Sequence, residues 1–107
     1  MTYTVYWTRL AEVKLAEIYD YYETSVNSSV AKKLVNTIVD KTIGIEKNRF
    51  IGQKEPLLKK YKEEFRYLIC KNYKIIYWVN SDKKRIEIAT VFDTRQNPIT
   101  LSKSLNP

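Results

Sequence analysis

Two cationic side chains, Lys74 and Arg95, are the residues of this sequence best suited to a catalytic or binding role. Lys74 lies inside an apolar run, and Arg95 lies in the polar stretch 93–98. A lysine and an arginine can hold a phosphate or stabilise a developing negative charge. Cleavage of a phosphodiester also needs groups that transfer protons, and the chain contains no histidine to do so. Lys74 and Arg95 are therefore the candidates for a catalytic role, and they lack an evident proton-transfer partner.

The polar stretch around Arg95 allows two interpretations. In the first, Asp93, Arg95, Gln96 and Asn97 form a surface that contacts a target. In the second, Asp93 caps the amides that follow it and pairs with Arg95, while Pro98 opens a helix in the tail. The residue types fit both interpretations, and both are kept open here.

Lys74 also has a functional and a structural interpretation. Its neighbours on the same face of a strand would be Ile76 and Trp78. An unpaired cation is costly to bury between such side chains. This cost favours a functional role for Lys74, in contact with a target.

Composition limits the other chemistry that the chain can support. The only cysteine, Cys70, lies in a predicted strand, which indicates a buried thiol and no intrachain disulfide. Without histidine the chain offers no His-based metal site, and we expect no metal and no cofactor. The 107 residues suggest a single domain, and the absence of a transmembrane run or signal peptide suggests a cytoplasmic protein that does not contact the membrane. A net charge of +7 favours an acidic partner, although solubility alone would also explain it.

Three apolar runs predict consecutive antiparallel strands over Phe65–Cys70, Tyr73–Val79 and Arg85–Phe92. Only Lys71 and Asn72 separate the first two runs, so we expect a two-residue hairpin loop in which Asn72 tolerates a positive φ. This loop would pair Cys70 with Tyr73, Leu68 with Ile75 and Arg66 with Tyr77.

Alternation along these strands predicts that both faces of the sheet are apolar. One face would carry Leu68, Cys70, Tyr73, Ile75, Tyr77 and Val79, and the other Phe65, Tyr67, Ile69, Lys74, Ile76 and Trp78. We expect helices on the first face. The second face would receive a partner or the tail of the chain, because large apolar patches usually mark interaction sites.

The first half of the chain predicts a strand over 2–8 and two helices over 9–24 and 30–47. Thr8 can cap the first helix, and Ser28 or Ser29 the second. The expected apolar stripes are Ala11, Leu15, Ile18 and Tyr22 on the first helix and Val30, Leu34, Ile38 and Ile45 on the second. The short connection predicts an antiparallel helical hairpin that packs on Leu68, Ile75 and Tyr77.

Two further segments lack a strong pattern. Residues 48–64 contain Gly52, Pro56 and four lysines, which favours a solvated surface loop. The tail over 99–105 suits one or two helical turns, docked through Ile99, Leu101 and Leu105.

The order of these elements, with the runs FRYLICKNYKIIYWV and IEIATVFDTRQNP, resembles the RelE/ParE superfamily of toxins from type II toxin–antitoxin systems. The resemblance covers nearly the whole chain. It implies an α+β, RelE/ParE-like fold with a two-helix hairpin on a twisted antiparallel sheet. It also implies a small basic toxin that inhibits growth until a cognate antitoxin neutralises it, in a possible toxin–antitoxin hetero-oligomer.

Two branches of this superfamily imply different targets. The ribosome-dependent branch cleaves mRNA as a metal-independent endoribonuclease, and the ParE branch binds DNA gyrase. Lys74 and Arg95 match arginines of the nuclease branch, but its paired lysines are replaced around Phe65 and Tyr67, and its C-terminal tyrosine falls near Leu101. The chain is therefore closer to ParE, with gyrase as the expected target and the ribosome with its mRNA as the alternative.

These resemblances complete the expected site assignments. Lys74, Asp93, Arg95, Gln96 and Asn97 would contact the target, and Tyr67, Ile69, Ile76 and Trp78 would contact the antitoxin. A basic nucleic-acid-binding module without toxicity is a third, weaker hypothesis.

Overall fold

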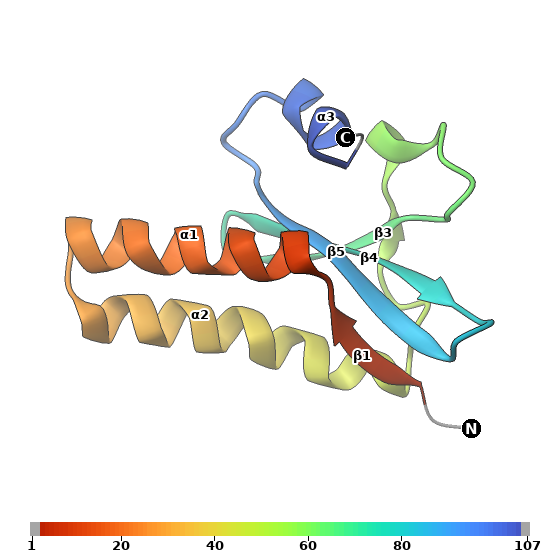
Figure 1. Cartoon of the computed structure of the whole chain (residues 1–107), viewed down its shortest axis with the longest axis horizontal. Helices are drawn as coiled ribbons and strands as arrows, with labels where there is room; N and C mark the ends of the chain where they lie inside the picture. The colour runs from red at the N-terminus through yellow and green to blue at the C-terminus, as the bar shows by residue number, and fades with distance from the viewer. Residues whose placement is uncertain (1–2, 106–107) are drawn as a thin grey trace.

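The chain folds as a five-stranded sheet with the order β1-β5-β4-β3-β2, covered on both faces. The computed structural model describes residues 3–105. The elements are β1 (Thr4–Trp7), α1 (Arg9–Ser25), α2 (Ser28–Ile43), the 3-10 turn η1 (Gly44–Glu46), β2 (Gln53–Lys54), the 3-10 turn η2 (Pro56–Leu58), β3 (Arg66–Cys70), β4 (Tyr73–Asn80), β5 (Arg85–Asp93) and α3 (Ile99–Leu105). Figure 1 shows α1 and α2 side by side in opposite directions, and α3 beside the segment between β2 and β3.

The central hairpin has the predicted register, with Cys70 opposite Tyr73, Leu68 opposite Ile75 and Arg66 opposite Tyr77. We had expected Asn72 to have the positive φ of the loop. Instead the positive φ falls on Lys71, at 55°. Asn72 is tied to the end of β5 instead, because its carbonyl accepts hydrogen bonds from the amide and the hydroxyl of Thr94.

Strands β3 to β5 are antiparallel, as predicted, and β2, which was not predicted, pairs antiparallel with β3. Strand β1 runs parallel to β5, so the sheet is mixed and not wholly antiparallel as expected. Opposite β4, the register of β5 shifts between Ile76 and Tyr77, which face Thr90 and Ile88. Such a bulge places one extra residue in the strand and changes its alternation. As a result, Ile88 and Val91, three residues apart, both pack on the helical side.

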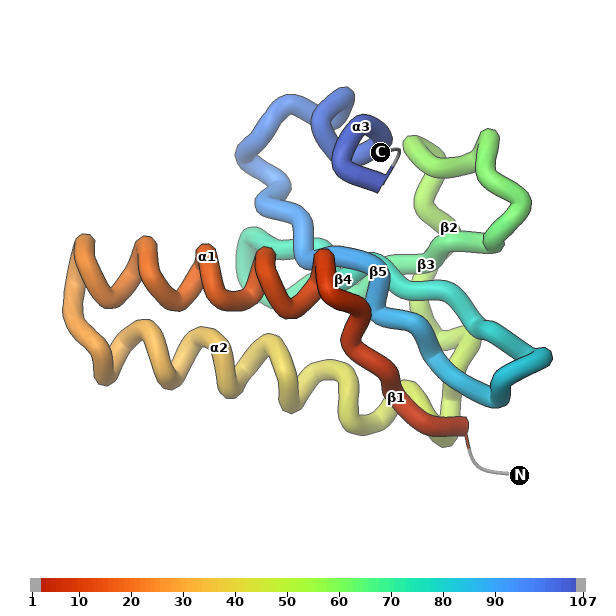
Figure 2. Tube along the Cα trace, in the orientation of Figure 1, coloured from red at the N-terminus to blue at the C-terminus, as the bar shows by residue number. Residues whose placement is uncertain are grey.

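The helical side of the sheet holds the larger core, and its predicted members are confirmed except for Val30. Its buried side chains include Ala11, Leu34, Ile38, Ile45, Ile75, Tyr77, Ile86 and Ile88. Thr8 caps α1 as expected: its hydroxyl accepts the amide of Ala11 and also donates to the carbonyl of Ile88 in β5. The N-terminal strand and the first helix are thereby fixed to β5, beside which β1 forms an edge of the sheet (Figure 2).

Helix α2 differs from its prediction at both ends. Asn27 caps it, not Ser28 or Ser29, because the Asn27 carboxamide oxygen accepts the amide of Val30 at 2.8 Å. Val30 therefore lies in the first turn, where it is exposed and does not belong to the core stripe. The α-helix ends at Ile43, before the predicted Lys47, and continues as a 3-10 turn from Gly44.

The opposite side, which we call the outer face, carries a second, smaller core of Leu58, Phe65, Ile76, Ala89, Phe92 and Leu101. Residues 48–64 are therefore not simply a solvated loop, since they supply Leu58 and the edge strand β2. Gly52 is needed in this segment: a Cβ there would lie 2.6 Å from the Tyr77 hydroxyl and 2.7 Å from the Tyr67 carbonyl. The tail docks through Leu101, with Leu105 partly buried, whereas Ile99 is exposed and makes no such anchor.

Candidate functional site

A groove of about 580 Å³ lies between α1, the end of β5 and α3. It brings together residues that are far apart in the sequence. Its charged and aromatic lining comes from Lys14, Glu17, Tyr21, Tyr73, Phe92, Asp93, Arg95 and Lys103. Of the residues predicted to contact a target, Asp93, Arg95 and Gln96 line this groove. Asn97 follows them and caps the tail helix, accepting the amide of Ile99 on its side chain and that of Thr100 on its carbonyl.

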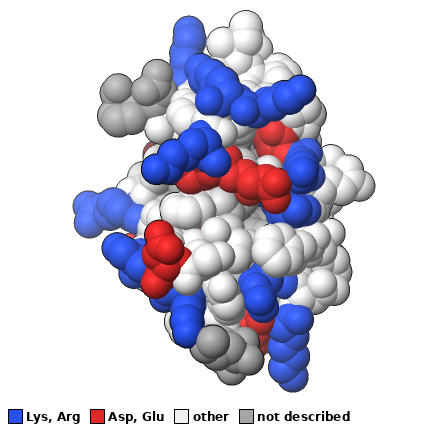
Figure 3. Space-filling view, turned by 90° about the vertical axis from the view of Figure 1, so that its right-hand side faces the viewer, with Lys and Arg blue, Asp and Glu red and all other residues white. Residues whose placement is uncertain are grey.

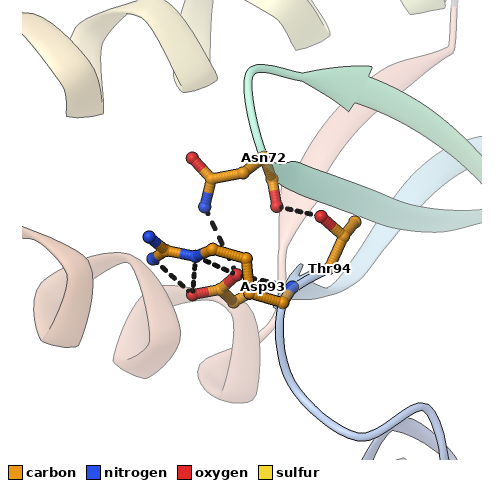
Figure 4. A network of polar contacts seen from close by, with 4 residues as sticks. Asn72, Asp93 and Thr94 are labelled. Carbon is orange, nitrogen blue, oxygen red and sulfur yellow. Dashed lines mark hydrogen bonds and ion pairs between the residues drawn. The ribbon is translucent and has the colours of Figure 1, made fainter.

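Asp93 and Arg95 form a tight pair at the mouth of the groove. Nε and Nη2 of Arg95 donate to the carboxylate of Asp93 at 3.0 and 2.8 Å, and the Arg95 amide donates to Asp93 Oδ1 at 2.9 Å. Figure 4 shows Asn72 reaching toward Asp93 from the central hairpin, with its side-chain nitrogen 3.3 Å from Oδ1. The structural interpretation of Asp93 as a cap is confirmed, and it orients Arg95, whose side chain is 59% exposed.

The contact between Asp93 and Arg95 favours the charged form of both side chains. The hydrogen bonds from Arg95 lower the pKa of Asp93 to about 2, so the carboxylate is ionised at neutral pH. The same contact raises the pKa of Arg95, with smaller contributions from Tyr22 and Tyr73. Burial and a hydrogen bond with Tyr22 raise the pKa of Tyr73 well above its ordinary value. A hydroxyl with a raised pKa stays protonated, so Tyr73 cannot serve as a general base at neutral pH.

Lys74 lies on the outer face and is not the unpaired cation that the sequence suggested. Its Nζ is 2.7 Å from Oε1 of Glu55, whose side chain is fully buried. It also lies over the ring of Tyr67, 4.2 Å from the ring centroid. An ion pair offsets the cost of burying each charge. Lys74 therefore has a structural role, holding the segment after β2 against the sheet.

The two candidate catalytic cations are not brought together. Lys74 pairs across the strands with Phe92 on the outer face, whereas Asp93, which holds Arg95, pairs with Tyr73 on the helical side. The sheet separates the two groups. Leu101, near the place of the nuclease tyrosine, is fully buried in the outer core.

The four residues predicted to contact an antitoxin all lie on the outer face, but they differ in how exposed their side chains are. Ile76 is fully buried beneath the segment after β2 and the tail, so it is not accessible as we had expected. Tyr67 and Trp78 are partly buried at the border of this core. Ile69 is 50% exposed and remains open to a partner.

Sequence reasoning missed Glu55, Tyr73 and Tyr22 as members of these clusters. Glu55 follows a two-residue strand and lies 19 positions before Lys74, so no periodicity links the two. The predicted register could have found Tyr73, because it placed that side chain on the helical face, where Tyr22 was also expected. Among residues 3–105, no three acidic or thiol side chains gather as a metal ion would require, and no helix there is long and apolar enough to cross a bilayer.

Comparison with known proteins gives a family for this fold. The model of the ParE toxin of the type II toxin–antitoxin system parDE matches residues 5–98. The structure of a chromosomal ParDE toxin–antitoxin system from P. aeruginosa is similar, with a TM-score of 0.70 and 23% identity, over 85% of this chain and 95% of the other. The RelBE2 toxin–antitoxin complex from Mycobacterium tuberculosis is also similar, with a TM-score of 0.60 and 14% identity, over 87% and 99% of the two chains.

No curated protein sequence gives a significant match. At these identities the two solved structures support the fold, and the family match supports the assignment. That match spans well over half of the chain and includes the groove residues of β5. The chain belongs to the ParE toxin family of type II toxin–antitoxin systems.

Proposed function

We propose that this toxin inhibits growth in the cytoplasm by binding DNA gyrase, and that a cognate antitoxin neutralises it. The observation that carries the proposal is the separation of Lys74 from Arg95 by the sheet, with Lys74 already paired with Glu55. A metal-independent RNA cleavage site needs its phosphate-binding cations beside a proton-transfer group. Here the two cations do not meet at one site, which favours a toxin that acts by binding.

The groove beside α1 is the proposed contact with gyrase. Arg95 is held in one orientation by Asp93 and remains largely exposed, and Gln96 lies next to it. A cation held in place loses little side-chain entropy when it binds an acidic surface, and preorganisation of this kind favours affinity. Asp93 and Asn97 would position the contact, and Arg95 with Gln96 would make it. Lys74, on the other face, has no place in this contact.

The antitoxin is proposed to bind the open part of the outer face, at Ile69 and Trp78. One of the two similar structures is a toxin–antitoxin complex, which fits a toxin–antitoxin hetero-oligomer for this chain as well. Ile69 is exposed near the loop end of the hairpin, and Trp78 is partly covered further along β4. Each offers apolar area that a partner can bury. Trp78→Ala should weaken antitoxin binding in a titration while the toxin stays folded.

Expression without antitoxin tests the proposed target. Supercoiling of a reporter plasmid should fall after induction, while mapped mRNA ends stay unchanged. Arg95→Ala should restore growth and supercoiling, and Arg9→Ala, an exposed arginine outside the groove, should not. Codon-phased mRNA cuts within minutes, with supercoiling intact, would instead assign the chain to the ribosome-dependent branch.

A further inference from the structure

We propose that the lysine loop, residues 54–64, is a binding surface for the phosphate backbone of duplex DNA. This extends the proposed function, because gyrase works on duplex DNA, and it assigns the toxin a direct contact with that DNA. The loop contains Lys54, Lys59, Lys60 and Lys62. Figure 3 shows a group of Lys and Arg side chains on the upper part of the face that carries this loop, above a band of acidic side chains, and further Lys and Arg side chains below.

The lysine loop is held in a fixed position by contacts along its length. Glu55 is buried and bound to Lys74, and the Glu55 amide donates to the carbonyl of Phe65 at 2.9 Å. Leu58 is buried in the outer core, and the hydroxyl of Tyr61 donates to the carbonyl of Ser102 in α3 at 3.2 Å. The exposed lysines therefore extend from a backbone that is already ordered.

The carboxylates of the loop are mostly neutralised inside the protein. Glu55 is paired with Lys74, and Glu64 is paired with Arg66 at 2.8 Å and with Lys54 at 3.1 Å. Lys59, Lys60 and Lys62 are exposed, and within residues 3–105 none of the three forms an ion pair. The loop therefore presents three uncompensated cations within four residues, next to one remaining acid, Glu63.

These features fit duplex DNA better than a single strand. Proteins that hold single strands stack bases on exposed aromatic rings. The aromatic residue of the loop, Tyr61, packs edge-to-face on Phe65, is hydrogen-bonded to α3 and has Lys60 Nζ 5.4 Å from its ring centroid, so its ring is already engaged within the protein. Clustered lysines without a stacking ring are suited to sequence-independent contact with regularly spaced phosphates.

A salt titration on DNA alone provides the test. The full chain is titrated, without gyrase, against a fluorescent 30-base-pair duplex, and anisotropy is measured from low to moderate salt. We expect the triple variant Lys59→Gln, Lys60→Gln and Lys62→Gln to bind at least tenfold more weakly at low salt. The magnitude of its slope of log affinity against log salt should decrease by about 2.7, because each of the three phosphate contacts contributes about 0.9.

A matched triple variant controls for net charge. Lys32→Gln, Lys33→Gln and Lys41→Gln removes three exposed lysines from α2 and should leave the slope nearly unchanged. Circular dichroism verifies that both variants are folded. Absence of duplex binding, equal losses in the two variants, or equal competition by single-stranded RNA or polyglutamate would each overturn the inference. None of these results depends on supercoiling, so the gyrase proposal succeeds or fails separately.

Discussion

The two faces of the sheet are covered in different ways. The helical face is closed by α1 and α2, which contribute long apolar stripes to one continuous core. The outer face is closed by two short segments, η2 and α3, each with one fully or nearly fully buried anchor, Leu58 and Leu101. Polar ties supplement these anchors, namely the Lys74–Glu55 ion pair and the Tyr61–Ser102 hydrogen bond.

This difference makes the helical face the more stable one and the outer face the one that a partner can reach. A face closed by many interlocked apolar side chains resists local opening, whereas short segments with few anchors open at lower free energy. The outer face is therefore the face on which a partner can compete with the protein's own cover. The helical side provides a rigid support for Arg95 and the groove.

The adjacent residues Ile75 and Ile76 give the largest expected effect and compare the faces directly. Both are fully buried, Ile75 in the helical core and Ile76 in the outer core. Ile75→Ala should lower the free energy of unfolding by about 2–5 kcal/mol. Ile76→Ala should cost clearly less, because the short outer segments can settle into the space. Denaturant unfolding of both variants measures the difference, and a larger loss for Ile76→Ala would reverse the comparison.

The ion pair of the outer face should have the next largest effect. Glu55→Gln removes the anion from Lys74 and should cost about 2 kcal/mol, since hydrogen bonds to charged groups contribute about 1.5–3 kcal/mol. Glu64→Gln, at an exposed position, should lower stability much less, because solvent screens an exposed ion pair. Adding Lys74→Met to Glu55→Gln should recover part of the loss. If thermal unfolding shows no difference between the two single variants, the pair does not hold the loop.

The tail anchor should affect local opening more than global stability. Leu101→Ala removes the fully buried side chain of α3, so we expect faster amide exchange over residues 99–105 and easier cleavage there by protease. Ile99→Ala, at an exposed position, serves as the control and should change neither. Unfolding in denaturant should change by less than about 2 kcal/mol, at the low end for such truncations. Uniformly faster exchange throughout the sheet would instead indicate one cooperative core.

The Asp93–Arg95 pair should give the smallest effect, visible in the pH dependence of stability. The pKa of Asp93 is lowered from 3.8 to about 2 in the folded protein. The pair therefore stabilises the fold fully above pH 4, and this contribution is lost as the pH falls from about 4 to 2. Asp93→Asn should remove this dependence on pH: its melting temperature should lie furthest below that of the wild type at pH 7 and close to it near pH 2. An unchanged acid profile would show that the pair does not contribute to folding.

The same contrast explains what the sequence could predict. The helical face followed from regular spacing: Leu34 and Ile38 lie one turn apart, and Ile75 and Tyr77 alternate along a strand. The hairpin register followed from a two-residue loop. The bulge at Ala89 leaves no such signal, because it depends on how β5 fits against β4.

The candidate site was predicted in part. Contacts between residues close in the sequence could be predicted, but contacts with distant segments could not. Asp93 and Arg95 are two positions apart, so their pairing was one of the two interpretations. Glu55 reaches Lys74 only through the path of an irregular segment, and the position of Arg95 on the other side of the sheet depends on the corner at Asn72. Contacts between distant segments without periodicity are not evident in a single sequence.

The most direct measurement of the proposed mechanism uses purified components. Toxin is added in increasing amounts to DNA gyrase, relaxed plasmid and ATP, with no ribosomes present, and the topoisomers are resolved on a gel. Wild-type toxin and Arg9→Ala should abolish supercoiling with equal potency, and Arg95→Ala should need at least tenfold more protein. The proposal that the toxin acts on gyrase would be contradicted if supercoiling stayed undiminished at a large excess of toxin while the same preparation cleaved mRNA in a translation reaction.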